Sequence, residues 1–412
     1  MTPTTRRLLT GRTFAAFATA LIPITLTLAV VHTGSATDLG LVLACELLPM
    51  LLLLPVAGVV ADRFPPQRVV LTADLVRATA QLAIGAELLA GPVRIPDLAV
   101  LSAITGAAVA FGTSAVRTLV AAVVPDPERL QTNARLAVAQ GLAQMAAPAA
   151  AGGLMLLVGA GWSSLLTGTL FIASATTLGG LRPHRAPRRA EQGAFLGELR
   201  EGWVETRRHP WFLANVLAHG VWHLAAGFLL TLGPMIAVDR LGGERAWVII
   251  AQVGTVGLLI GVWAASRLPI RRPLVAVAVG AAVYALPLTS LALHAPIAVV
   301  ATAYFAGMFG LGVLHPLWET TLQRRIPPES LGRVGSFDSL ISFAARPLGL
   351  AIAAPIAAAI GTTAPLLIGA VLVLVANLAP LLLADVRATP AAPSPAPNPA
   401  PATDKVPEPE PT

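Results

Sequence analysis

Long apolar runs, separated by short polar loops, dominate the pattern of this 412-residue chain. A helix needs about 20 apolar residues to cross a bilayer, and continuous rather than alternating runs favour helices over a transmembrane β-barrel. Twelve runs are long enough: 12–33, 38–60, 69–90, 98–122, 134–158, 161–181, 211–237, 245–265, 273–293, 296–320, 334–358 and 362–385. The pattern predicts an all-α integral membrane protein with twelve transmembrane helices in two six-helix pseudo-repeats.

Arginine alternates sharply between successive loops. One side receives Arg6, Arg7, Arg12, Arg63, Arg68, Arg129, Arg135, the cluster from Arg182 to Arg208, Arg267, Arg271, Arg272, Arg324, Arg325, Arg333 and Arg387. The other side receives only Arg94, Arg240 and Arg245. Because arginine-rich short loops stay in the cytoplasm, both termini and the central loop are predicted to be cytoplasmic.

The spans divide the chain into four parts. Residues 1–181 are predicted to form an N-terminal six-helix bundle, 182–210 a cytoplasmic central loop, and 211–387 a C-terminal six-helix bundle. Residues 388–412 are rich in proline and alanine, which predicts a disordered cytoplasmic tail. Within the central loop, the spacing of Phe195, Leu199 and Trp203 predicts an amphipathic helix at the membrane surface.

Composition excludes several classes of protein. Only 12% of the residues are charged and 55% are apolar, whereas soluble domains carry about a quarter charged residues. The sequence pI of about 11.0 does not indicate nucleic-acid binding, because the arginines lie between apolar runs. The single cysteine, Cys45, excludes a disulfide framework and a cysteine-based zinc site. We find no phosphate-binding loop and no nucleophile elbow, and we predict neither an enzyme nor a cofactor.

Two loops of the first half recur in the second half. VADRFPPQRVVL (60–71) aligns with AASRLPIRRPLV (264–275), and VPDPERL (124–130) resembles IPPESL (326–331). The alignment matches Arg63, Pro65, Arg68 and Glu128 to Arg267, Pro269, Arg272 and Glu329. Short basic loops can resemble one another by chance, but the shared offset favours duplication. Parallel repeats of this kind are a transporter architecture.

The segment from Gly58 to Arg68 resembles the signature G-x-L-A-D-R-x-G-R-K of the major facilitator superfamily. The stretches VVPDPERLQTNARLAVAQ and QRRIPPESLGRVGSFDSLISFAARPLG are similar to a branch of bacterial macrolide and siderophore exporters that are driven by proton antiport. The resemblance implies a multi-pass protein of the bacterial cell membrane that acts as a monomer, with a small-molecule substrate and protons as its partners.

The same resemblance implies roles for individual loop residues. Gly58 would allow close helix approach, and Asp62 and Arg63, with Arg68, would belong to a gating network between helices. The sequence departs from the signature downstream, where Pro65, Pro66 and Gln67 replace the usual glycine and basic residues. In the second repeat Ser266 aligns with Asp62, so that copy lacks the acid.

Three ionisable residues within spans are candidates for proton coupling, because charges at bilayer depth are costly and tend to face a cavity or a partner. Glu46 has no basic residue within four positions, although it could equally be hydrogen-bonded to a neighbouring helix. His219 and His223 flank Trp222 near the middle of their span, and imidazole exchanges protons near neutral pH. Packing histidines are the alternative, and no metal site is predicted because further ligands are lacking.

A second cluster lies in the tenth span, where His315, Trp318 and Glu319 share one helix face. It could bind an amphipathic substrate or close an inner gate through Arg117 or Arg346; a polar cluster at the membrane surface is the alternative. Glu319 is the expected counter-ion of Arg346, and Glu319 is also a candidate for proton coupling.

Asp74 and Arg77, three residues apart on the third span, are expected to form a structural ion pair. These features favour a proton-coupled exporter of a small hydrophobic or amphipathic compound. An uptake symporter or facilitator with the same fold, and a membrane scaffold without transport activity, are the alternatives.

Overall fold

The computed structural model describes residues 2–31, 36–91, 94–179, 181 and 195–388. Its helices are α1 (Pro3–Val31), α2 (Ala36–Arg63), α3 (Pro66–Ala90), α4 (Ile95–Val123), α5 (Asp126–Val158), α6 (Ala160–Leu178), α7 (Phe195–Arg208), α8 (Pro210–Arg240), α9 (Glu244–Arg267), α10 (Pro273–Ala282), α11 (Ala285–Ala292), α12 (Ile297–Arg325), α13 (Leu331–Ile360), α14 (Thr363–Leu378), η1 (Ala379–Leu382) and α15 (Ala384–Arg387). Residues 182–194 of the predicted central loop lie outside the described residues, as does the predicted tail from residue 389 onward.

Within the described residues each predicted span is essentially helical, which confirms the all-α membrane fold class. Ten segments of the described chain are long and apolar enough to cross a membrane. The other two predicted spans form α5 and α6. Glycine, serine and threonine are frequent in α6, and they lower its mean hydropathy without shortening the helix.

Prolines start several of these helices. Pro66, Pro210 and Pro273 occupy the first turns of α3, α8 and α10. A proline is favoured there because its fixed φ suits the helix and its missing N–H would have no partner inside the first turn. Each of these prolines therefore marks the point where the loop ends and the helix begins.

The ninth span, predicted at 273–293, is present as Pro273–Ala292, but it is interrupted by a turn. It divides into α10 and α11 at Val283 and Tyr284. Pro287 explains the break, because it has no N–H to donate to the carbonyl of Val283 and its ring crowds that carbonyl. The chain tightens instead, with the Tyr284 N–H donating to Ala281 at 3.2 Å.

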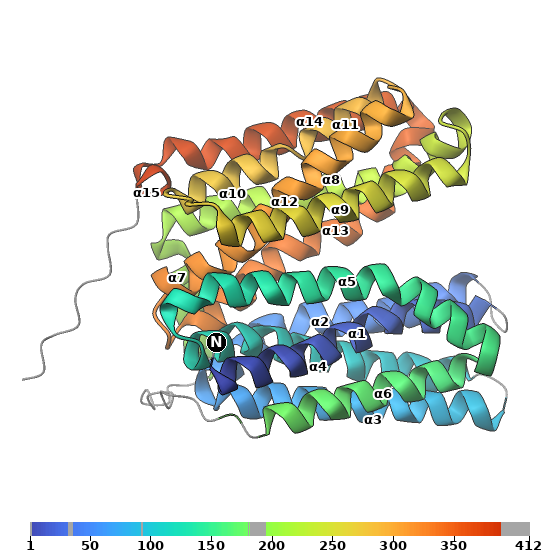
Figure 1. Ribbon diagram of the computed structural model, residues 1–412, viewed down its shortest axis with the longest axis vertical. Coiled ribbons are helices and arrows are strands. Elements are labelled where there is room, and N and C mark those ends of the chain that lie inside the picture. Colours follow the sequence, from blue (N-terminus) through green and yellow to red (C-terminus); the bar gives the residue numbers. More distant parts are fainter. Residues whose placement is uncertain (1, 32–35, 92–93, 180, 182–194, 389–412) are drawn as a thin grey trace, which may run out of the picture.

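Helices α1–α6 pack against one another, as do helices α8–α14 (Figure 1). We call these two groups the N-bundle and the C-bundle. In the figure, α1 begins and α15 ends on the same side of the molecule, where α7 also lies. We call this the terminal side.

Contacts between the bundles join α2 to α13, α4 to α13 and α12, and α5 to α9 and α12. The amphipathic helix α7 forms as predicted and packs against α2 and α13, with the Trp203 and Phe337 rings 5.5 Å apart. Polar contacts between the bundles gather on the terminal side, and they define the candidate site.

Candidate transport site

Arg117 of α4 links the two bundles through a group of charged side chains. Its Nε and Nη2 atoms donate to the two carboxylate oxygens of Glu319 on α12, each at 2.7 Å. Nη2 also donates to Asp338 on α13 at 3.0 Å, and Nη1 donates to the Gly335 carbonyl at 2.8 Å. Two-pronged arginine–carboxylate contacts are among the strongest polar contacts in proteins. Arg117, Glu319 and Asp338 together are called the Arg117 cluster below.

Aromatic side chains cover the cluster on the C-bundle side. The Trp318 Nε1 atom donates to the Asp338 carboxylate, at 3.2 and 3.3 Å from its two oxygens. The Trp318 ring stacks on Phe212 with centroids 5.8 Å apart, and the His219 ring meets it edge-on at 4.9 Å. Asp338 is only 7% exposed, so its charge depends on these donors rather than on water.

Sequence reasoning missed Asp338. It is the single acidic residue within the predicted span 334–358, and this is the same signal that singled out Glu46. An isolated carboxylate at bilayer depth requires a partner. Applied evenly along the chain, that rule finds Asp338.

The expectation that Glu319 neutralises Arg346 is wrong in this structure. Both oxygens of Glu319 are bound by Arg117 instead. Arg346 is exposed and makes no ion pair with any residue that the structure describes. Of the two arginines considered for the gate, geometry therefore selects Arg117.

Asp62 forms a second polar connection between the bundles, at the start of α13. Its carboxylate accepts the backbone N–H groups of Gly332 at 2.7 Å and Arg333 at 3.0 Å, and the Arg333 Nε atom at 3.1 Å. Backbone N–H groups in the first turn of a helix lack partners within the helix, and a carboxylate there also meets the positive end of the helix dipole. Asp62 thus caps a helix of the other bundle.

Neighbouring charges extend this connection onto α7. Arg63 donates to Glu198 at 2.7 Å, and Arg333 donates to Glu201 at 3.1 Å. Arg68, by contrast, is exposed and makes no ion pair within the described part of the chain. The structure therefore brings Gly58, Asp62 and Arg63 to the bundle contact and leaves Arg68 outside it.

Gly58 lets α2 approach α13 closely. A Cβ atom at this position would lie 2.8 Å from the Gly332 carbonyl oxygen and would overlap the Ser336 side chain. Because a backbone oxygen cannot move aside as a flexible side chain can, the helices can meet here only through glycine.

Gly58→Ala is expected to hold the bundles apart on the terminal side and to slow transport severalfold. The opening can be measured as a longer distance between spin labels at Thr10→Cys and Arg272→Cys, one in each bundle, with Cys45 replaced by serine. Gly40→Ala is the matched control, because α2 also contains Gly40 and nothing lies within 4 Å of a Cβ there. An unchanged distance in Gly58→Ala would contradict the role of this contact.

Helix α5 makes the corresponding contact with α12. Asn133 donates to Thr320 and to Gln323, each at 3.0 Å, and Arg324 pairs with Asp126 at 3.1 Å. Ser266, the second-repeat counterpart of Asp62, donates to the Trp263 carbonyl of its own helix at 2.8 Å, and within the described chain it makes no hydrogen bond to the other bundle. The two repeats therefore close the terminal side by different chemistry.

The remaining proton-coupling candidates do not meet in one place. Glu46 lies within electrostatic reach of Arg77, and its backbone packs directly against Gly106 of α4, both within the N-bundle. His219 contacts Trp318, and the ring of His223 lies 4.6 Å from that of Phe343. His315, a candidate for the substrate cavity, is exposed and lies within electrostatic reach of Glu319 and Arg117, so it borders the Arg117 cluster.

Asp74 and Arg77 lie inside the N-bundle, as part of a larger group. Their side chains are 4.0 Å apart, while Asp74 is closer to Arg12, at 3.1 Å, and accepts from Ser174 at 2.7 Å. Arg77 also donates to Thr19 at 2.6 Å. This group joins α1, α3 and α6, which accords with the structural role expected for the pair.

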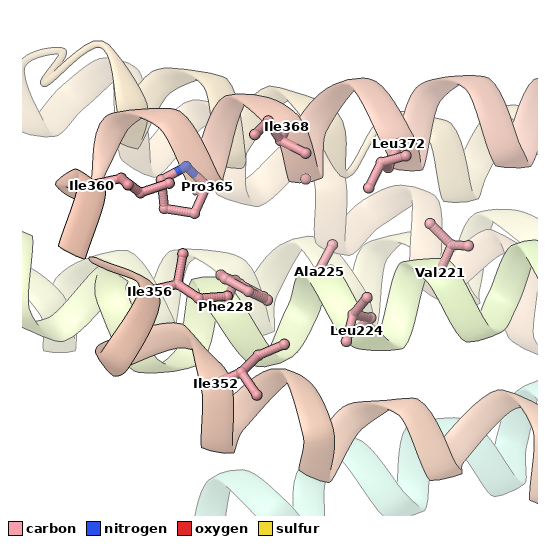
Figure 2. A pocket seen from close by; sticks show the side chains of 11 residues that line it. Val221, Leu224, Ala225, Phe228, Ile352, Ile356, Ile360, Pro365, Ile368 and Leu372 are labelled. Carbon is pink, nitrogen blue, oxygen red and sulfur yellow. The ribbon is translucent and has the colours of Figure 1, made fainter. Parts of the chain in front are cut away.

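An apolar groove lies away from all these charges, between α8, α13 and α14 (Figure 2). Val221 and Phe228 line one wall, Ile356 another, and Ile368 and Leu372 the third. None of the predicted site residues lines it. The groove offers no charged or hydrogen-bonding side chain with which to select a ligand.

The family model described as Major Facilitator Superfamily matches residues 8–350. The chain belongs to the major facilitator superfamily. It is therefore a multi-pass membrane transporter and not an enzyme, and the resemblance found in the sequence is confirmed.

Relatives and solved structures agree with this assignment. The multidrug efflux pump Tap of Mycolicibacterium fortuitum is 26% identical over 350 residues, covering 82% of this chain and 84% of that protein. Tap of Mycobacterium tuberculosis is 28% identical over 385 residues, covering 87% and 88%. A bacterial homologue of the iron transporter ferroportin, in an outward-facing state, superposes with a TM-score of 0.77 at 18% identity, covering 92% and 99%. The proton:xylose symporter XylE superposes with a TM-score of 0.71 at 13% sequence identity, covering 91% of this chain and 94% of that chain.

Proposed function

We propose that this transporter exports a small hydrophobic or amphipathic organic compound across a bacterial cell membrane by proton antiport. Residues 1–181 and 211–387 would act as two bundles that rock about a central site, which then opens to one side at a time. The similarity to Tap multidrug efflux pumps supports export and a drug-like cargo.

The observation that carries this proposal is the closure of the terminal side by polar contacts between the bundles. Asp62 and the Arg117 cluster hold α13 against the N-bundle, and Asn133 holds α5 against α12. Such contacts can break and reform as units, unlike a continuous apolar interface. The arginine-rich loops support a cytoplasmic terminal side, and with that orientation the structure would correspond to a state closed to the cytoplasm.

Proton coupling is supported by the charge balance of the Arg117 cluster. One guanidinium faces two carboxylates, which leaves one excess negative charge among Arg117, Glu319 and Asp338. Addition of one proton would neutralise that excess and weaken the hold on Arg117. Protonation would therefore favour separation of the bundles on this side, as exchange of a proton for cargo requires.

The direct test uses everted membrane vesicles with an acidic interior and three dansyl probes: dansylglycine, dansylglycinamide and dansylethylenediamine. We expect at least one probe to accumulate inside, to draw protons out of the vesicles, and to stop accumulating when an uncoupler is added. Vesicles without the protein provide the baseline. Movement of probe and protons in the same direction would contradict antiport, and no movement of any probe would contradict export of this class of compound.

A further inference from the structure

Arg346 is an unpaired charge at the middle of a membrane-spanning helix. It lies near the centre of the 30-residue helix α13, is exposed, and forms no ion pair within the described chain. A charged side chain at this depth is costly unless it faces a partner or a water-filled space. The carboxylates nearest along α12 and α13, Glu319 and Asp338, are already bound by Arg117.

The neighbours of Arg346 lie within the C-bundle. His223 of α8, Tyr284 at the break between α10 and α11, and Tyr304 of α12 are all within its electrostatic reach. Three other elements of the C-bundle therefore place polar side chains within reach of Arg346, and α13 itself packs against α8 and against α2 and α4 of the N-bundle. On this basis the exposed side chain of Arg346 is assigned to an opening between the helices rather than to the lipid.

Two further polar atoms beside this opening have no partner. Trp222 Nε1 and His223 Nδ1 are buried and make no hydrogen bond within the described chain. Trp222 is only 8% exposed, and its ring lies 4.5 Å from that of Tyr284 and 5.0 Å from that of His223. An indole N–H is always a donor, and a buried donor without an acceptor is unfavourable.

These groups match one kind of ligand. A guanidinium and an indole N–H both donate, and a neutral imidazole can donate from one nitrogen, so the set is complementary to a carboxylate or another anionic group. The exposed ring of Phe343, 4.6 Å from His223, adds an apolar surface for the rest of the molecule. A cationic compound would be repelled by Arg346.

We propose that Arg346, with Trp222 and His223, binds the anionic group of an amphipathic cargo in the C-bundle. This inference rests on the proposed function, but it narrows the cargo to compounds that carry a carboxylate or a similar negative charge.

Binding to the purified full-length protein in lipid nanodiscs, without any proton gradient, tests this site. The probes are dansylglycine and dansylglycinamide, which share a fluorophore and differ in the carboxylate, and dansyl emission reports their dissociation constants. We expect dansylglycine to bind the unaltered protein about tenfold or more tightly than the amide, because a charge-assisted hydrogen bond is lost with the carboxylate. Equal affinities would overturn the proposal without any variant having to fold.

Arg346→Gln is expected to reduce dansylglycine affinity to that of the amide, and Arg346→Lys to keep part of the preference. Arg240→Gln is the matched control, because it removes the same charge from the exposed end of α8 and should leave the preference unchanged. A full preference in Arg346→Gln would overturn the proposal. Intact Arg346-dependent binding without gradient-driven transport would contradict the proposed function alone.

Discussion

Arg117→Gln is expected to abolish transport and to lower thermal stability more than any other single change in the bundle contact. The substitution leaves Glu319 and Asp338 without their common partner, and these side chains are only 19% and 7% exposed. Removing one member of a buried ion pair costs about 3–5 kcal/mol, because the remaining charge stays buried. Part of this cost is relieved if the bundles separate and water enters. We therefore expect both a lower melting temperature and a longer distance between spin labels at Thr10→Cys and Arg272→Cys.

Three comparison variants separate charge from geometry. Arg117→Lys keeps the charge but has three donor protons on a single nitrogen, which cannot reproduce the four hydrogen bonds of the Arg117 guanidinium, so partial loss is expected. Arg94→Gln removes an arginine from an exposed pair with Asp97 and should change stability by less than about 1 kcal/mol. Combining Arg117→Gln with Glu319→Gln and Asp338→Asn should restore stability but not transport. Unaltered stability and transport in Arg117→Gln alone would refute the importance of the cluster.

The twelve helices could be predicted from the sequence because a bilayer imposes one physical rule. Every backbone polar group within it must be bonded internally, so each long apolar run has to form a helix. The rule fixes the existence of a span and not its continuity. The break at Val283 required attention to Pro287, whose effect falls four residues upstream.

The partner of Glu319 could also have been found from helix depth. Arg117 and Glu319 each lie six residues before the end of their helix on the terminal side, and Asp338 lies seven after the start of α13. At 1.5 Å per residue, all three are about 9–11 Å deep, whereas Arg346 is about 22 Å deep. Depth along the helices therefore indicates Arg117, and not Arg346, as the partner of Glu319. Rotation of each helix about its own axis, which decides actual contact, depends on packing and could not be read from one sequence.

The capping of α13 by Asp62 could be predicted only in part from the sequence. The resemblance of the loop to a known signature indicated a charge network, but it did not identify the partners. These are mainly backbone N–H groups of Gly332 and Arg333, which carry no side-chain signature. A helix N-terminus or an arginine is the expected kind of partner for such a carboxylate, but a search for complementary charges cannot tell which helix supplies the backbone N–H groups.

Glu319→Gln and Asp338→Asn are each expected to abolish proton-driven accumulation of cargo while leaving exchange of cargo across the membrane. Each change removes the excess negative charge of the Arg117 cluster, so a proton is no longer needed to weaken the hold on Arg117. The bundles can then alternate without taking up a proton. The measurement compares accumulation driven by an acidic vesicle interior with exchange of labelled for unlabelled probe at equal pH, using a dansyl probe that the unaltered protein accumulates. Glu319→Asp, which keeps the charge, should retain part of the accumulation.

Glu46→Gln tests whether proton coupling resides at Glu46 rather than in the Arg117 cluster. Glu46 lies within electrostatic reach of Arg77 inside the N-bundle and makes no polar contact across the bundles within the described residues, so its charge would not change partner when the bundles separate. A proton site drives the conformational change only if its environment differs between the two states. We therefore expect Glu46→Gln to keep most of the accumulation. Loss of accumulation in Glu46→Gln, with full accumulation in Glu319→Gln and Asp338→Asn, would move the coupling site into the N-bundle.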